Sequence, residues 1–206
     1  SARSHVLPER YRTLAERLER EGYRSFGVMI NAIAGRRFKF DQGFSTYLDP
    51  LDGYHGDSYT LDQLLYWFYE NPHQQKFVYL HTSGVHWHYP DAFKNESFLN
   101  RTAFFEGGDL IYEPGSYFFK PGIIEYLRAG KIELTERQRD FLRTMYASQL
   151  NYYDREYFVR LRGLLAQFGF MREGLFAVTA DHGEELYERG HFGHGRTLYE
   201  EIIHVP

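Results

Sequence analysis

Residues 175–195 read LFAVTADHGEELYERGHFGHG, a short apolar run that leads into a polar segment rich in histidine. The first six residues are apolar enough for a strand that is buried on both faces. Polar side chains directly after such a strand are typical of a parallel sheet, in which functional residues gather at the carboxyl ends of the strands. This stretch therefore predicts an α/β fold with a functional site at one edge of its sheet.

Two other short apolar runs predict the partners of this strand. They are SFGVMI at residues 25–30 and KFVYLH at residues 76–81, each with the length and apolar content of a buried strand. Helical segments separate the runs, and this alternation builds a mostly parallel sheet flanked by helices on both faces. We expect one α/β unit, with irregular stretches at residues 36–49 and 82–133.

Three capping boxes predict where helices begin. In each, a threonine is followed three residues later by Glu or Gln, so that the two side chains satisfy free N–H groups of the first turn. The three boxes start at Thr13, Thr60 and Thr135. The periodicity after Thr135 predicts a helix that extends to about residue 167, with a bend or interruption at Gly163.

The composition excludes several classes of protein. The chain has 206 residues, of which 43% are hydrophobic and 25% charged, so it can bury a core. Its formal net charge of −4 predicts no basic surface for nucleic acid, and it has no cysteine for a disulfide, a thiolate zinc site or a thiol nucleophile. No apolar run has the length of a membrane span or a signal peptide core. We expect a soluble domain, with compartment and oligomeric state left open.

The histidines are not evenly spread along the chain. Six of the ten lie in two short windows that follow predicted strands: His81, His86 and His88, then His182, His191 and His194. Histidine is the usual metal ligand and the usual general acid or base near neutral pH. The sheet topology brings the two windows together, because the carboxyl ends of parallel strands meet at one edge. Chance clustering in a histidine-rich chain is the alternative.

Asp181-His182-Gly183 is the most specific local signal. A carboxylate and an imidazole just past a buried strand can both turn toward one cation, and the glycine lets another part of the backbone pass close by. Glu184 and Glu185 follow, and we interpret them as a solvated helix start. His191 is equally consistent with a surface loop residue and a further ligand.

The segment ADHGEELYERGHFGHGRTLYEEIIHVP at residues 180–206 resembles the late active-site segment of sulfatases, in the alkaline-phosphatase-like superfamily. Three upstream segments resemble the same family in the right order. They are TLAERLEREGYRSFGVMIN with FDQGFSTYLD, then FVYLHTSGVHWHYP, and then YYDREYFVRLRGLLAQFGFMREGLFAVTADHG. The resemblance spans most of residues 6–206 and implies an incomplete alkaline-phosphatase-like fold.

The resemblance implies a metal site. Asp181 and His182 would be ligands of one divalent ion. Calcium prefers oxygen ligands, so an imidazole ligand at His182 favours manganese, magnesium or zinc. If His182 instead hydrogen-bonds the nucleophile, calcium is favoured.

The resemblance also implies catalytic and substrate-binding residues. His86 would contact the sulfate or the leaving oxygen, and His194 would stand near the place of the family's lysine that binds the transferred group. Arg196 is the competing candidate for that positive charge. His88 stands in the substrate loop where proline is usual, and Gly84-Val85 replaces an aspartate-proline pair, so we expect a loop of different shape.

Two parts of the family pattern are not found in this sequence. The Cys/Ser-x-Pro-x-Arg nucleophile segment and two further metal carboxylates belong upstream of the segment that residues 6–23 resemble. The apolar pattern at Val205-Pro206 stops midway, so a downstream part is also expected. We therefore interpret residues 1–206 as a single partial catalytic domain that is inactive alone.

These observations predict a metal-dependent sulfuric ester hydrolase that acts, within a longer protein, on a small-molecule or carbohydrate sulfate ester. A phosphate or phosphonate monoester hydrolase, or a phosphoethanolamine transferase, of the same superfamily is the first alternative, and the upstream nucleophile decides between them. The second alternative is a catalytically dead sulfatase-like binding module that uses the aromatic residues of 82–133 for sugar stacking.

Overall fold

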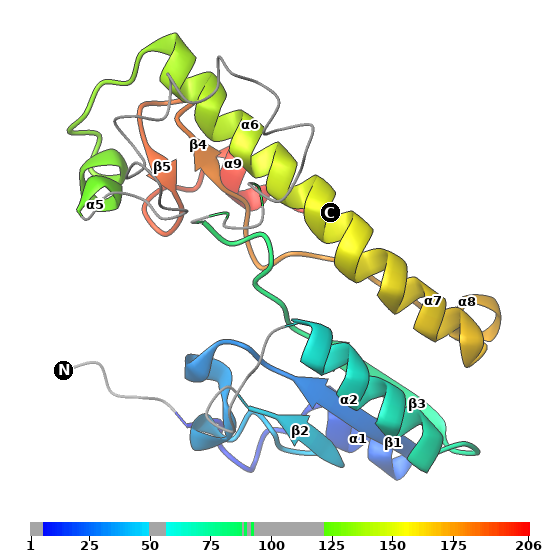
Figure 1. Cartoon of the computed structure of the whole chain (residues 1–206). Helices are drawn as coiled ribbons and strands as arrows, with labels where there is room; N and C mark the ends of the chain where they lie inside the picture. Colours follow the sequence, from blue (N-terminus) through cyan, green and yellow to red (C-terminus); the bar gives the residue numbers. More distant parts are fainter. Residues whose placement is uncertain (1–5, 50–56, 88, 90–91, 93–121) are drawn as a thin grey trace. The chain divides into compact units, whose positions relative to one another are not determined.

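The computed structural model describes residues 6–49, 57–87, 89, 92 and 122–206 (Figure 1). The chain divides into two compact units, residues 1–83 and 84–206. Each unit has its own core, and each is described by itself.

The first unit contains a three-stranded parallel sheet. Its central strand is β1 (Tyr23–Val28), with β2 (Thr46–Leu48) on one side and β3 (Gln75–Leu80) on the other. At the level of Phe26, the partners are Thr46 in β2 and Val78 in β3. The two predicted strands are thus confirmed, within one or two residues. The strand β2 lies in a stretch expected to be irregular, because three residues are too few to produce a recognisable period.

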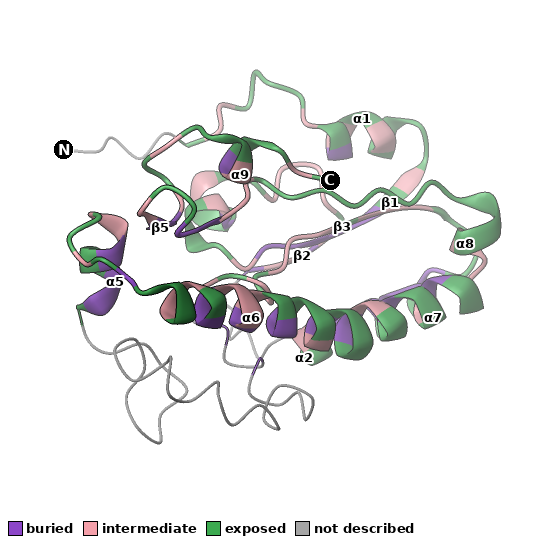
Figure 2. Ribbon diagram, turned by 90° about the horizontal axis from the view of Figure 1, so that it is seen from above, coloured by how far each residue is buried: buried purple, intermediate pink, exposed green. Residues whose placement is uncertain are grey.

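Helices α1 (Leu14–Arg20) and α2 (Asp57–Glu70) cover opposite faces of this sheet, as Figures 1 and 2 show. The capping box at Thr13 is confirmed, because Thr13 Oγ1 accepts a hydrogen bond from Glu16 N–H and Glu16 Oε2 accepts one from Thr13 N–H. Trp67 of α2 packs on Phe26 of β1, with 5.4 Å between ring centroids. These contacts confirm the predicted α/β architecture with helices on both faces.

The predicted helix start at Thr60 is wrong. Helix α2 begins at Asp57, three residues earlier, and Thr60 is buried on the packed side of the helix. A capping threonine must stand outside the first turn, so Thr60 cannot cap this helix. Asp57 instead places a negative charge in the first turn, where the helix dipole favours it.

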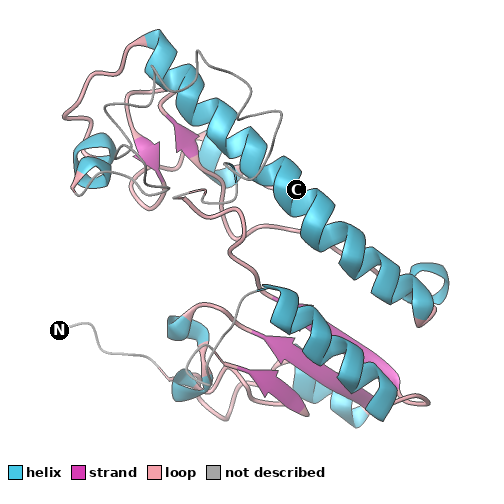
Figure 3. Ribbon diagram, in the orientation of Figure 1, coloured by secondary structure: helices cyan, strands magenta, loops and turns pink. Residues whose placement is uncertain are grey.

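The second unit is built around one long helical segment (Figure 3). Helix α6 (Glu136–Tyr153) passes through a π-helical turn at Asp154–Phe158 into α7 (Val159–Gln167). The capping box at Thr135 and the extent of the helix are confirmed. The interruption lies at the π-helical turn and not at Gly163, which is an exposed residue inside α7.

Helix α5 (Ile123–Arg128) and a β-hairpin pack with α6 around the core of the second unit. The hairpin consists of β4 (Glu185–Leu186) and β5 (Phe192–Gly193), which pair antiparallel. The core side chains come from all three parts and include Leu127, Leu142, Met145, Tyr187 and Phe192. Helix α5 lies in the stretch 82–133 that was expected to be irregular, and residues 93–121 of that stretch are outside the described residues.

The strand predicted at residues 175–180 is not formed. These residues follow the short helix α8 (Phe170–Glu173) without strand pairing, and Leu175 is 95% exposed. A strand needs a neighbour to take up its N–H and C=O groups, and no described segment of the second unit pairs with this one. The apolar run was correctly seen, but its burial depends on a partner that the local sequence does not specify.

The chain ends with the short helix α9 (Glu200–Ile203). Among the described residues, no helix is both long and apolar enough to cross a bilayer.

Candidate functional site

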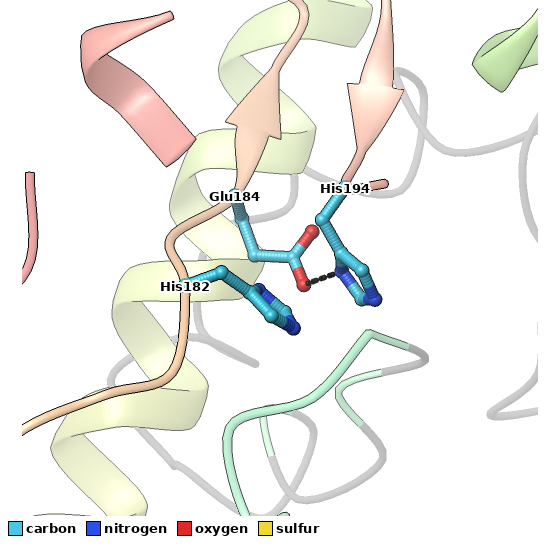
Figure 4. Close-up of side chains that lie close together, drawn as sticks. All are labelled: His182, Glu184 and His194. Atoms are coloured by element: carbon cyan, nitrogen blue, oxygen red, sulfur yellow. Dashed lines mark hydrogen bonds and ion pairs between the residues drawn. The ribbon is translucent and has the colours of Figure 1, made fainter. Parts of the chain in front are cut away.

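Three side chains of the second unit, those of His182, Glu184 and His194, point into the same space (Figure 4). One ligand atom from each lies within 4.8 Å of the others. Glu184 directly precedes β4 and His194 directly follows β5, and these strands pair with Glu185 opposite Gly193. The hairpin therefore holds the carboxylate beside the imidazole, while His182 arrives from the segment just before it.

Hydrogen bonds orient both imidazole rings. Nδ1 of His182 lies 2.9 Å from the carbonyl oxygen of Gly183, and Nδ1 of His194 lies 2.7 Å from Oε1 of Glu184. An oxygen acceptor holds the proton on Nδ1 and leaves the Nε2 lone pair available. This is the arrangement found in metal-bound histidines and in general bases. The two rings pack with 3.9 Å between centroids.

His86 joins the cluster from the other histidine window. Its ring lies edge-on to that of His194, with 5.2 Å between centroids. Helix α6 holds the loop that carries it, because the Gln149 side chain donates a hydrogen bond to the carbonyl oxygen of Gly84. The Tyr153 ring packs so closely on Gly84 that a Cβ there would overlap it. The two predicted windows thus meet through His86, His182 and His194.

Glu184 is the most buried member of the cluster. Its side chain is 7% exposed, and its Oε2 atom is buried without a hydrogen-bond partner among the described residues. Burial raises the pKa of Glu184 to about 7, against the opposing charges of His86, His182 and Arg128. Burial also lowers the pKa values of His86 and His194, with smaller contributions from neighbouring positive charges. The neighbouring positive charges therefore do not fully offset the cost of burying the negative charge of Glu184.

Arg128 brings a permanent positive charge close to the cluster. It ends helix α5, and its Nη2 donates a hydrogen bond of 2.9 Å to the carbonyl oxygen of His194. Gly193 and Gly195 flank His194 with φ of +85° and +83°, a backbone region that favours glycine. The arginine therefore fixes a tight loop that only these glycines allow. The sequence did not predict this role, because α5 was not recognised.

Asp181 lies at the surface beside this cluster. Its side chain is 71% exposed, and its Oδ2 lies 3.8 Å from Nε2 of His182. The neighbouring Gly183 fits its expected role, because a Cβ there would overlap the backbone carbonyl of Glu201. Its N–H also donates a 2.7 Å hydrogen bond to the carbonyl oxygen of Ile202. The close backbone passage inferred from the sequence is thus observed.

Two of the remaining candidates, Arg196 and His191, are not members of the trio, and the third lies outside the described residues. Arg196 is exposed and has no ion-pair partner in the part of the chain that the structure describes. His191 is a partly exposed loop residue that packs against Gly130, where a Cβ would come within 3.0 Å of its ring, and it is not a member of the trio. His88 lies outside the described residues.

The interpretation of Glu184 and Glu185 as a solvated helix start is wrong. Both precede or begin a β-strand, and Glu185 is buried with its Oε2 accepting a hydrogen bond from Thr197 Oγ1. The β-hairpin that contains these residues was predictable from the sequence. Short apolar stretches on either side of Glu188-Arg189-Gly190 are typical of a hairpin with a glycine-containing turn.

The chain matches the protein family described as Sulfatase over residues 2–206. Comparisons with curated proteins and with solved structures found no match.

Proposed function

Because the chain belongs to the sulfatase family, we propose that it takes part in the metal-dependent hydrolysis of a small-molecule or carbohydrate sulfate ester at the cluster around His182 and His194. The observation that carries this proposal is the meeting of three imidazoles, from two distant windows of sequence, around one buried carboxylate.

The residues present fit a divalent metal ion. Two ligands at about 2.1 Å from one ion lie at most about 4.2 Å apart, so the 3.8 Å between Asp181 Oδ2 and His182 Nε2 is a separation that one ion can bridge. The unpartnered Oε2 of Glu184 supplies a further negative centre nearby. A bound ion would polarise a sulfate oxygen and lower the pKa of the nucleophile.

His86 is proposed to exchange a proton with the ester, and His194 is proposed to stabilise the charge that develops on the bridging oxygen. Each has Nδ1 facing an oxygen, the carbonyl of Trp87 for His86 and the Glu184 carboxylate for His194. In the protonated His86 ring, Nε2 would be the atom that gives a proton to the leaving oxygen. Positioned acid catalysis of this kind contributes roughly 10²–10⁴-fold to the rate. Arg128 adds a nearby positive charge through the His194 loop, and Arg196 and His88 stay candidates for substrate contact.

The test uses the full-length protein that contains this chain, with an aryl sulfate, a phosphate monoester and a phosphonate monoester as substrates. We expect sulfate ester turnover, and a fall in kcat of roughly 10²–10⁴-fold for His86→Asn and His194→Asn. His204→Asn, at an exposed histidine of the same unit, is the matched control and should keep full activity. Turnover of only the phosphorus esters would instead favour the phosphoester hydrolases. No turnover of any substrate, with the fold intact, would favour the binding module.

A further inference from the structure

We propose that Glu184 is itself a metal ligand, and that Glu184, His182 and His194 together select a zinc-class transition metal over calcium or magnesium. This inference builds on the metal-dependent function proposed above and gives its site a ligand set and a metal class. It concerns binding alone, so it can fail or stand independently of any sulfate ester turnover.

The first support is the geometry of the trio. Two ligands at about 2.1 Å from a tetrahedral zinc ion lie about 3.4 Å apart, so the ligand atoms, which lie within 4.8 Å of one another, would approach by at most about 1.4 Å. Rotation of the partly exposed His182 and His194 side chains provides movements of this size. The backbone under two of the ligands is fixed by the pairing of β4 with β5.

The second support is the state of the Glu184 carboxylate. Its Oε1 accepts the hydrogen bond from His194, whereas Oε2 is buried with no hydrogen-bond partner among the described residues. A buried carboxylate oxygen without a partner is costly, because folding removes the water that would have solvated it. A cation at this oxygen removes that cost, and no side chain in the described part of the chain does so.

The third support is the chemistry of the donor atoms. Two imidazoles and one carboxylate suit zinc and its neighbours, whereas calcium and magnesium prefer oxygen ligands throughout. Together with Asp181 from the proposed function, the trio would supply two imidazoles and two carboxylates, a number within the four to five ligands that zinc accepts. The hydrogen bonds at both Nδ1 atoms match the outer contacts that metal-bound histidines make.

The test measures the Zn²⁺ affinity of the full-length protein that contains this chain by competition with a chromophoric chelator, and the visible spectrum of the same protein loaded with Co²⁺. We expect Glu184→Gln and His194→Asn each to weaken Zn²⁺ binding by at least roughly 10–100-fold and to change the Co²⁺ absorption bands. His204→Asn should leave both unchanged. A large excess of Ca²⁺ or Mg²⁺ should not displace the bound Zn²⁺.

Each contrary result overturns a defined part of the proposal. If Glu184→Gln keeps wild-type Zn²⁺ affinity and Co²⁺ spectrum, Glu184 only orients His194 and is not a ligand. If Ca²⁺ displaces Zn²⁺ at comparable concentration, the metal class is wrong. Circular dichroism of the metal-free variants separates a lost ligand from a lost fold. Tight Zn²⁺ binding without sulfate ester turnover in the full-length protein would reject the proposed function and leave this inference standing.

Discussion

Replacing Glu184 by glutamine should stabilise the metal-free chain at alkaline pH, although it removes a hydrogen-bonded carboxylate. Burial raises the pKa of Glu184 from its ordinary value of 4.5 to about 7. Between these two values the unfolded chain releases the proton while the folded chain retains it. The unfolded state then binds fewer protons, so the free energy of unfolding falls as the pH rises through this window. Glutamine is a neutral residue of the same shape and does not titrate.

The magnitude follows from the size of the pKa change. Each tenfold change in proton affinity is worth about 1.4 kcal/mol, so a rise from 4.5 to about 7 corresponds to about 3 kcal/mol of lost stability at pH 8. At pH 5 most of this loss has not yet occurred. For a chain of this size, about 3 kcal/mol corresponds to roughly 6–12 °C in the midpoint of thermal unfolding.

The assay compares thermal unfolding of the two proteins in the presence of a chelator from pH 5 to pH 8. The difference between them is the readout, because other titrating groups are shared and cancel. Glu133→Gln, at an exposed glutamate of the same unit, is the matched control and should follow the wild type. The reasoning is refuted if the Glu184→Gln advantage does not grow with pH. With saturating Zn²⁺ the order should reverse, because only the wild type keeps the carboxylate ligand.

Three further predictions concern the groups around the cluster. Gly84→Ala should lower the free energy of unfolding by about 1–3 kcal/mol, because the added methyl group overlaps the Tyr153 ring. Gly163→Ala, at an open helical position, should raise it by about 0.5–1 kcal/mol. Urea unfolding measures both, and equal effects would contradict the packing argument. Gly183→Ala should lower both the stability and the Zn²⁺ affinity, since its Cβ meets a backbone carbonyl that cannot rotate away, and normal affinity would exclude this. Asp181→Asn should abolish metal retention by the full-length protein, and unchanged metal content in elemental analysis would remove Asp181 from the ligands.

The parts of the fold that the sequence predicted correctly depend on local patterns. A few adjacent residues determine a capping box or a short apolar strand. The expected elements were therefore formed at the capping boxes of Thr13 and Thr135 and at the apolar runs of β1 and β3. The stretch 175–180 has an equally apolar pattern but no pairing partner among the described residues of its unit. A pattern of apolar residues reports that a segment tends to be buried, and it does not report which neighbour buries it.

The candidate site was predictable to a similar degree. Residue type and spacing were sufficient to bring His86, His182 and His194 together as candidates. Glu184 was missed because its burial depends on the hairpin register, and Arg128 was missed because it acts on a segment 66 positions away. Long-range contacts of this kind leave no periodicity in the sequence.

The hairpin also makes one part of the site much more local in the sequence than the other. Glu184 and His194 are 10 positions apart in the chain, whereas the contact between Gln149 and Gly84 that holds the His86 loop spans 65 positions. Closing the longer loop costs roughly 1.5–2 kcal/mol more in chain entropy. The carboxylate–imidazole pair therefore closes a short loop. The position of the His86 loop depends instead on a contact with α6 that is distant in the sequence, so we expect destabilisation of α6 to release His86 before it separates Glu184 from His194.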